Sequence, residues 1–530
     1  MNKSRFLTSF LCLMALMSVD AQTPAVPRLV VNILVDQLRT DYLEAFAPLY
    51  GEGGLKRLLS EARYYTDAAP AFRKPDRASA AASLVTGTVP YDNGITGLTW
   101  LSRKTLQPVF CVDDSRFTGI QTQDRTSPAN LLTSSLSDEL EIATGGNSII
   151  YSICPERDMA VLMAGHNADG AFWLNDQTGA WSSTSYYGDY PHWVSVYERA
   201  NTLATRIKKM QWTPLYQGAV SSFHYFHSAS EEQTKLFKHK FEGDRRYREL
   251  KTSPLVNEEV NHLVEQCLAS TGIGRDYVPD MLNIGYYAGN YNHARASQSP
   301  AEMQDAYARL DRSLAKLIAS VEKYVGAGKA LFVLSSTGYA DSEVAAIDYT
   351  AHKIPTGTFD MNKASMLLNM YLGAIYGQEQ YVEATRDAQI FLNHRIIEQK
   401  NLRFADVLAR CEEFLVQMSG VREVYTTLRL KAGNWEKGLD RVRNSWNAVT
   451  CGDIIVDVHP GWKIATQQST EIINGGEPYC SYPLFFFGPG ISPERLTTPV
   501  VTTVIAPTVA QCLRIRAPNG STDSPLIIEH

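Results

Sequence analysis

Three polar positions each follow an apolar run that is typical of a buried strand. Asp36 ends the run LVVNILV, Asn290 stands with Gly289 just beyond MLNIGYY, and Ser336 comes shortly after ALFVL. In open α/β sheets, ligands and reacting groups lie beyond the carboxyl ends of the parallel strands. We therefore expect any active site of this chain at these positions.

Two further groups of residues could bind a metal ion, but neither has a regular ligand spacing. One is a set of histidines in a tyrosine-rich stretch, for which exposed surface positions are the simpler interpretation: His224, His227 and His239. The other follows Ser336 and could form a rebuilt metal site: Asp341, Asp348, His352 and Asp360. The chain has no Cys-x-x-Cys pair, so we expect no cysteine zinc site.

The elements that position these residues alternate along the chain between short apolar runs and helical patterns. This alternation predicts an α/β fold with a doubly wound, mostly parallel sheet and helices on both faces. We expect strands at 29–35, 148–153, 281–287, 330–334 and 483–487, and helices at 55–62, 131–143 and 301–321. Two stretches lack the alternation, and we predict that they are cap insertions over the sheet: 171–261 and 381–450.

Six segments occur in the order in which one known family has them. They are VVNILVDQLRTDYL at 30–43, YGEGGLKRLLSEARYYTDAAP at 50–70, SLVTGTVPYDNGITGLTW at 83–100, MAGHNADGAFWLND at 163–176, KIPTGTFDMNKASMLLNMYL at 353–372 and APTVAQCLRIRAPNGSTDSPL at 506–526. Together they resemble the alkaline phosphatase superfamily, in its type I phosphodiesterase/nucleotide pyrophosphatase branch, close to the bacterial phosphate-irrepressible alkaline phosphatases.

The resemblance implies two zinc ions held by Asp and His, and a Thr or Ser nucleophile at the head of a helix. It also implies an Asn and a Lys-x-Arg pair that hold the phosphate oxygens. Asp36 and His293 each match one expected metal ligand. The other ligand positions carry residues that are poor zinc ligands: Asn290 (or Gly289), Ser336, Thr337 and Ser481.

The expected nucleophile and phosphate clamp are also replaced. Arg77 falls at the nucleophile position, and a charged guanidinium is neither a nucleophile nor a zinc ligand. A shift of register would place Ser79 there instead, so Ser79 remains an alternative. Leu98 stands for the Asn and Pro155-Glu156-Arg157 for the Lys-x-Arg pair, which leaves only Arg157.

These replacements predict a catalytically degraded family member without zinc, in which Arg77 pairs with Asp36 as a structural plug. About one protein ligand remains in each zinc site, whereas zinc sites need at least three. We expect a binding or scaffolding protein with an unknown protein partner rather than an enzyme. Two alternatives stay open: an active metal-dependent phosphomonoesterase or phosphodiesterase with a rearranged site, and an anion-binding protein that holds phosphate with Arg77 and Arg157.

The N-terminus predicts export. Lys3 and Arg5 precede the apolar run Phe6–Val19, and cleavage is expected after Ala21, so residues 1–21 are a signal peptide and 22–530 one domain with insertions. No later apolar run is long enough to span a bilayer. The net charge of −6 gives no footprint for nucleic acid. We expect a periplasmic or otherwise exported protein of the bacterial cell envelope that is not an integral membrane protein.

Overall fold

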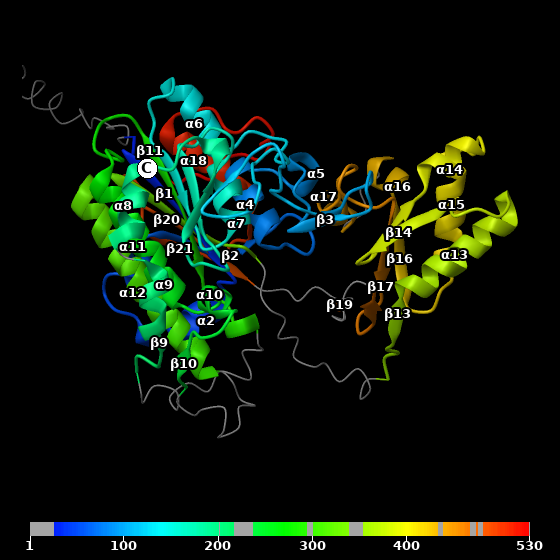
Figure 1. Cartoon of the computed structure of the whole chain (residues 1–530), viewed down its shortest axis with the longest axis horizontal. Coiled ribbons are helices and arrows are strands. Elements are labelled where there is room, and N and C mark those ends of the chain that lie inside the picture. Colours follow the sequence, from blue (N-terminus) through cyan, green and yellow to red (C-terminus); the bar gives the residue numbers. More distant parts are fainter. Residues whose placement is uncertain are drawn as a thin grey trace, which may run out of the picture.

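The computed structural model describes residues 26–200, 202–216, 237–293, 300–338, 353–432, 438–466, 473–474 and 481–528. The chain forms a main body around one large sheet, and a smaller lobe from Thr358 to Ala465 lies beside it (Figure 1). None of the helices in the described ranges is long and apolar enough to cross a bilayer. Several positions of interest lie outside these ranges: the predicted signal peptide, His224, His227, Asp341, Asp348 and His352.

The centre of the large sheet is a run of five parallel strands. In spatial order they are β12 (Ala330–Ser336), β1 (Leu29–Asp36), β11 (Asp280–Tyr287), β6 (Ile150–Ile153) and β7 (Gly170–Leu174). The sheet as a whole is mixed, because β20 pairs with β12 and β8 pairs with β7 in antiparallel orientation, and further strands follow on each side. These outer strands are β20 (Tyr482–Phe487), β2 (Arg63–Ala69) and β21 (Glu494–Leu496) on one side, and β8 (Trp181–Thr184) and β5 (Gly119–Ile120) on the other.

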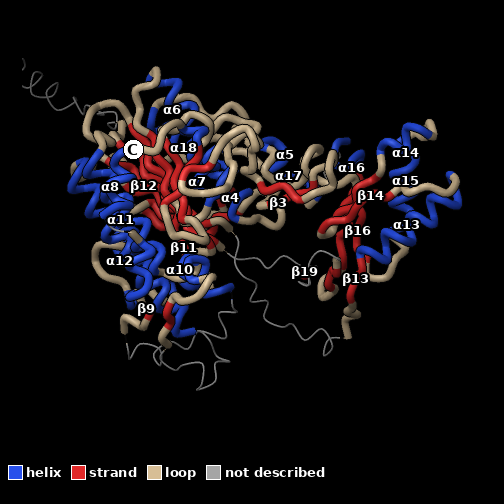
Figure 2. The backbone as a smooth tube through the Cα atoms, in the orientation of Figure 1, coloured by secondary structure: helices blue, strands red, loops and turns tan. Residues whose placement is uncertain are grey.

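Helices cover both faces of the sheet, as the alternation of side chains in β1 requires. Val31, Ile33 and Val35 of β1 belong to one hydrophobic core, and Val30 and Leu34 belong to the other. The first core is closed by α8 (His192–Ala200), α11 (Leu255–Ser270) and α12 (Pro300–Val325). The second is closed by α4 (Arg77–Thr86), α6 (Leu136–Thr144), α7 (Arg157–Ala164) and α18 (Ile505–Leu513). Figure 2 shows the strands enclosed between these helices.

The predicted strands and helices of the main body are present, although the helix predicted at 131–143 begins only at Leu136, as α6. The first predicted insertion needs a correction. The prediction places all of residues 171–261 over the sheet, whereas β7 and β8 are part of the sheet itself. The run GAFWL in β7 is fully buried, and two of its five residues are aromatic. Because the surrounding stretch is rich in Trp, Tyr and charge, its composition obscures these two short strands.

The second predicted insertion, 381–450, is the middle of a larger lobe with its own hydrophobic core. Its sheet has the order β14 (Val382–Arg386), β15 (Gln389–Leu392), β17 (Ile454–Val458) and β16 (Val421–Thr426). The lobe begins before residue 381 because α13 (Met361–Tyr376) packs into the same core through Met361, Leu368 and Leu372. Figure 1 shows α13 and α15 (Phe404–Leu415) on the side of this sheet that faces away from the main body.

Two buried aspartates of the segment that forms β17 attach the lobe to the main body. Asp453 accepts two hydrogen bonds of 3.1 Å from Arg103, and Asp457 accepts one of 3.0 Å from Arg73. Beside them, the Asn444 and Arg441 side chains of α17 (Leu439–Asn444) donate to the carbonyls of residues 71 and 72. The lobe thus holds the segment that leads into α4, which begins at Arg77.

Candidate functional site

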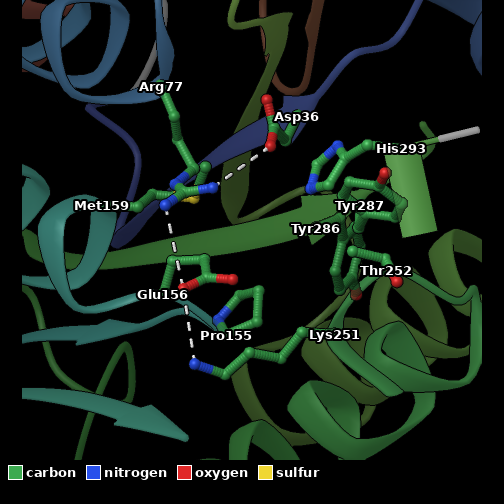
Figure 3. A pocket seen from close by; sticks show the side chains of 10 residues that line it. All are labelled: Asp36, Arg77, Pro155, Glu156, Met159, Lys251, Thr252, Tyr286, Tyr287 and His293. Carbon is green, nitrogen blue, oxygen red and sulfur yellow. Dashed lines mark hydrogen bonds and ion pairs between the residues drawn. The ribbon is translucent and has the colours of Figure 1, made fainter. Parts of the chain in front are cut away.

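A small pocket lies at the carboxyl ends of β1 and β11, where the sequence predicts a site. Its lining includes residues from strand ends and from the ends of helices (Figure 3): Asp36, Arg77, Glu156, Lys251, Tyr287 and His293. The cavity volume is ≈ 10 Å³, which is about what a single water molecule needs.

Asp36 is the buried carboxylate at the centre of this site. It is the last residue of β1 and only 4% exposed. Thr337 Oγ1 donates a hydrogen bond of 2.9 Å to Asp36 Oδ1, and Arg77 Nη1 lies 3.6 Å from Asp36 Oδ2. Burial raises the pKa of Asp36 to about 6, although Arg77 and Thr337 both act to lower this pKa.

Arg77 is the first residue of α4, and its guanidinium is surrounded by carboxylates. Its Nε and Nη2 donate to the two oxygens of Asp158 at 2.8 Å and 2.9 Å, the bidentate geometry that suits arginine. Asp36 lies 3.6 Å away and Glu156 3.7 Å away. Burial acts to lower the pKa of Arg77, but Asp158, with the other carboxylates, raises it well above its ordinary value. The guanidinium is therefore a fixed positive charge.

The charged network continues across the pocket to Lys251, whose side chain is 5% exposed. Lys251 Nζ lies 3.3 Å from Glu156 Oε2 and 2.5 Å from Asp176 Oδ1. Figure 3 shows Glu156 between the guanidinium of Arg77 and the ammonium of Lys251. Anionic and cationic groups thus alternate from Asp36 to Asp176, which compensates charges that would be costly to bury alone.

Ser79, the alternative nucleophile, belongs to the helix cap rather than to the pocket. Its Oγ lies 2.9 Å from Asp76 Oδ1, and its backbone N–H donates to the same oxygen, so the two residues form a capping box. Ser79 is 1% exposed and does not line the pocket. It lies two positions after Arg77 along the helix, which turns it about 200° around the helix axis.

Arg157, the remaining residue of the expected phosphate clamp, is engaged elsewhere. Its Nη1 lies 2.9 Å from Asp113 Oδ1 and donates a hydrogen bond of 3.0 Å to Thr126 Oγ1. Its guanidinium also stacks 4.3 Å from the centre of the Phe110 ring. Arg157 does not line the pocket, so the structure does not bring the predicted pair, Arg77 and Arg157, to a common anion site.

His293, the second of the two expected zinc ligands that the chain retains, also lines the pocket. Its Nδ1 lies 3.5 Å from Gln37 Nε2. The positions where ligands are replaced make local structural bonds. Thr337 bonds Asp36, and Ser336 Oγ accepts from the backbone N–H of Gly338 at 3.3 Å. The Asn290 carbonyl accepts a hydrogen bond of 2.7 Å from the Tyr287 hydroxyl. The Ser481 carbonyl accepts one of 3.0 Å from the backbone N–H of Thr40.

The other metal candidates that the structure describes also have structural partners. Asp360 caps α13 by accepting from the backbone N–H groups of Asn362 and Lys363. His239 Nε2 lies 2.6 Å from Glu302 Oε1, in a cluster of aromatic rings. No group of three or more His, Cys, Asp or Glu side chains suited to a metal ion is present among the described residues.

The donors that the described part of the chain places at the pocket do not fit a pair of zinc ions. Two of the expected ligands remain, and zinc sites use at least three. One oxygen of Asp36 faces the Thr337 hydroxyl and the other faces Arg77. A metal ion bound to Asp36 would therefore meet a hydrogen-bond donor on one side and a positive charge on the other.

Sequence reasoning missed the carboxylate partner that binds Arg77 most closely. Asp158 is 1% exposed and follows directly on Arg157, in the first turn of α7. The signal that could have found it lies in this stretch, where Pro155 stands at the position for which the resemblance implies a lysine and the acidic Glu156 follows it. Two acidic residues in this short stretch suit a cation such as Arg77 better than they suit a phosphate.

Comparisons with known proteins agree with the fold. Residues 30–480 match the family described as "Type I phosphodiesterase / nucleotide pyrophosphatase". The chain is 29% identical to alkaline phosphatase PafA of Elizabethkingia meningoseptica over 95% of both chains. It is 27% identical to a protein of Myroides odoratus named "Calcium-transporting ATPase", over 99% of this chain and 98% of that one.

Comparison with solved structures also supports this fold. The crystal structure of wild type alkaline phosphatase PafA superposes with a TM-score of 0.79 at 27% identity, covering 95% of this chain and 99% of that one. Murine ectonucleotide pyrophosphatase / phosphodiesterase 5 shares the fold alone, with a TM-score of 0.50 at 10% identity over 92% of this chain and 95% of that one.

Proposed function

Because this chain belongs to the type I phosphodiesterase / nucleotide pyrophosphatase family and yet carries an arginine at the head of α4, we propose that it is a catalytically degraded member. Its role is binding or scaffolding in the bacterial cell envelope, and it does not hydrolyse phosphate esters. The observation that carries this proposal is the contact of Arg77 with Asp158 at 2.8 Å and with Asp36 at 3.6 Å. The guanidinium takes the place that a metal ion at Asp36 would need.

The charge of the Arg77 guanidinium opposes a metal ion beside Asp36. Two unit charges 4 Å apart in a partly buried site interact with about 4 kcal/mol, so a divalent ion beside the guanidinium would be repelled by roughly 8 kcal/mol. Asp158 already satisfies Arg77 in bidentate geometry, and moving the guanidinium away would leave that buried carboxylate unpaired. The family reaction uses metal ions to stabilise charge on the attacking and leaving oxygens. The groups present here offer no substitute for that chemistry.

The nucleophile is missing as well. Arg77 is protonated and has no lone pair to attack phosphorus. The closest hydroxyl in sequence, that of Ser79, is buried in the helix cap. Phosphate binding by Arg77 receives less support, because three carboxylates already lie within 3.7 Å of its guanidinium.

Placement in the envelope and a protein partner are inferred from the sequence. The predicted signal peptide supports export, and a family member without chemistry would be retained for a surface that it presents. The identity of a partner does not follow from the pocket.

The test is metal content together with hydrolysis. We would dialyse the mature protein against zinc, remove free metal and measure bound zinc by elemental analysis. We would then assay p-nitrophenyl phosphate and bis-p-nitrophenyl phosphate, with PafA as the positive control. We expect less than about 0.1 zinc ion per chain and no turnover above the blank. Two zinc ions per chain with hydrolysis that a chelator abolishes would overturn the proposal.

Calorimetric titration with inorganic phosphate, for which we expect no binding heat, addresses the anion-binding alternative.

A further inference from the structure

Helix α13 of the small lobe has an unusual surface, because it is apolar on its exposed side as well as on its buried side. Only Lys363 among its 16 residues carries a charge. Met366 is 64% exposed and Met370 68% exposed. With Ala374, which is also exposed, these residues follow one another at intervals of four and form a single stripe along the helix. We call Met366, Met370 and Ala374 the α13 stripe.

Water-facing helices of globular proteins carry polar residues on the outer side, and α13 does not. Its buried side already packs into the core of the lobe, so the stripe is not needed for folding. Figures 1 and 2 show α13 on the face of the lobe that points away from the main body. Methionine is a flexible side chain that is common on adaptable binding surfaces. The stripe therefore suits an apolar partner that approaches the lobe from outside.

The charges at the two ends of α13 indicate which partner this is. Lys363 is exposed in the first turn. Glu379 follows the last turn; its side chain is 41% exposed and lies 3.6 Å from Lys400 of the same chain, so a Lys363 from a second copy would add to this ion pair. A second copy of α13 in antiparallel orientation, related by a two-fold axis near Met370, would set Met366 against Ala374 of that copy. The same axis brings each Lys363 toward the Glu379 of the other copy. The surface is thus complementary to itself, as a two-fold interface requires.

We propose that two copies of this chain associate through the α13 stripe, forming a two-fold dimer in which the small lobes meet and the main bodies lie outward. A membrane surface fits less well, because helices that bind lipid are rich in Lys and Arg and α13 has only Lys363. The helix is about 24 Å long, so the contact is smaller than that of a standard stable interface of about 1,600 Å². The dimer is therefore weak and depends on protein concentration. This inference does not rest on the proposed loss of catalysis.

The test is sedimentation velocity of the mature protein over a hundredfold range of concentration. We expect a shift from monomer to dimer for the wild type and a dissociation constant at least tenfold higher for Met370→Glu. Ile142→Glu is the matched control, because Ile142 is 69% exposed on α6 of the main body, and this variant should dimerise like the wild type. Thermal melts of all three proteins should coincide, since both substituted side chains are exposed.

A charge exchange tests the antiparallel arrangement. Lys363→Glu should weaken the dimer, and adding Glu379→Lys should restore it. A wild type that stays monomeric at every concentration, or a Met370→Glu variant that dimerises as well as the wild type, would overturn the proposal. Flotation with phosphatidylethanolamine/phosphatidylglycerol vesicles provides the other outcome, because a monomer that floats through Met370 would assign the stripe to lipid instead.

Discussion

A single arginine at the head of a helix sets the character of the pocket. Replacement of Arg77 by Met would leave Asp158, which is 1% exposed, without its bidentate partner. Removing one member of a buried ion pair costs about 3–5 kcal/mol. We expect Arg77→Met to lower the free energy of unfolding of the main body by that order, measured by urea denaturation followed with tryptophan fluorescence.

Two control variants separate this effect from a general loss of arginine. Arg157→Met should cost less, about 1 kcal/mol, because Asp113, the partner of Arg157, is 47% exposed. Adding Asp158→Leu to Arg77→Met should regain most of the lost stability, since a buried ion pair replaced by apolar groups is often tolerated. Equal costs for Arg77→Met and Arg157→Met would contradict the role given to Arg77.

Asp36 makes a prediction about pH. Its pKa is raised from 3.8 to about 6 in the folded state, mainly by burial. A carboxyl group with a raised pKa contributes stability that is fully present below about pH 4 and lost as the pH rises through about 6. The shift corresponds to roughly 3 kcal/mol. We therefore expect the stability difference between Asp36→Asn and the wild type to move in favour of the variant by up to that amount between about pH 4 and 7.

The comparison must be a difference between two proteins, because the pKa of Asp280 is also raised to about 6 by burial. Asp280 is unchanged in both proteins, so its contribution cancels. Urea denaturation of the wild type and Asp36→Asn at half-unit pH steps provides the measurement. A difference that stays constant across this pH range would show that Asp36 titrates normally.

At the scale of elements, periodicity predicts the main body well because strong patterns carry it. The run LVVNILV is apolar at every position except Asn32, as a strand covered on both faces must be. Within that strand, Asn32 Nδ2 donates a hydrogen bond of 2.9 Å to Asn283 Oδ1 of the neighbouring strand. The positions of the strand ends then follow from topology, and they place Asp36, Asn290 and Ser336 at one edge of the sheet, whereas His293 follows only from the resemblance.

The rest of the site could not be predicted, for two physical reasons. Lys251 and Asp176 reach the pocket from positions 75 residues apart, and neither lies at the end of a central strand. Ser79 and Arg77 are two residues apart, and only the backbone geometry of the capping box decides which of them points outward. The extent of the lobe escaped prediction because α13 carries apolar residues on exposed as well as buried positions, a pattern that does not reveal which core it joins.

At the scale of the whole molecule, the contact between the lobe and the main body depends on two aspartates. Asp453 lies directly before β17, and Asp457 lies within it. Arg103 and Arg73 are 26% and 18% exposed where they meet Asp453 and Asp457, and hydrogen bonds to charged groups contribute about 1.5–3 kcal/mol each. We expect Arg73→Met combined with Arg103→Met to loosen the attachment of the lobe, while the hydrophobic cores of the main body and of the lobe stay folded. Small-angle X-ray scattering at monomer concentrations should then show a larger maximum dimension than in the wild type.

Arg422→Met is the control, because Arg422 binds the same Asp457 from within the lobe. If the double variant scatters like the wild type, the contacts of α17 with residues 71 and 72 suffice to hold the lobe in place.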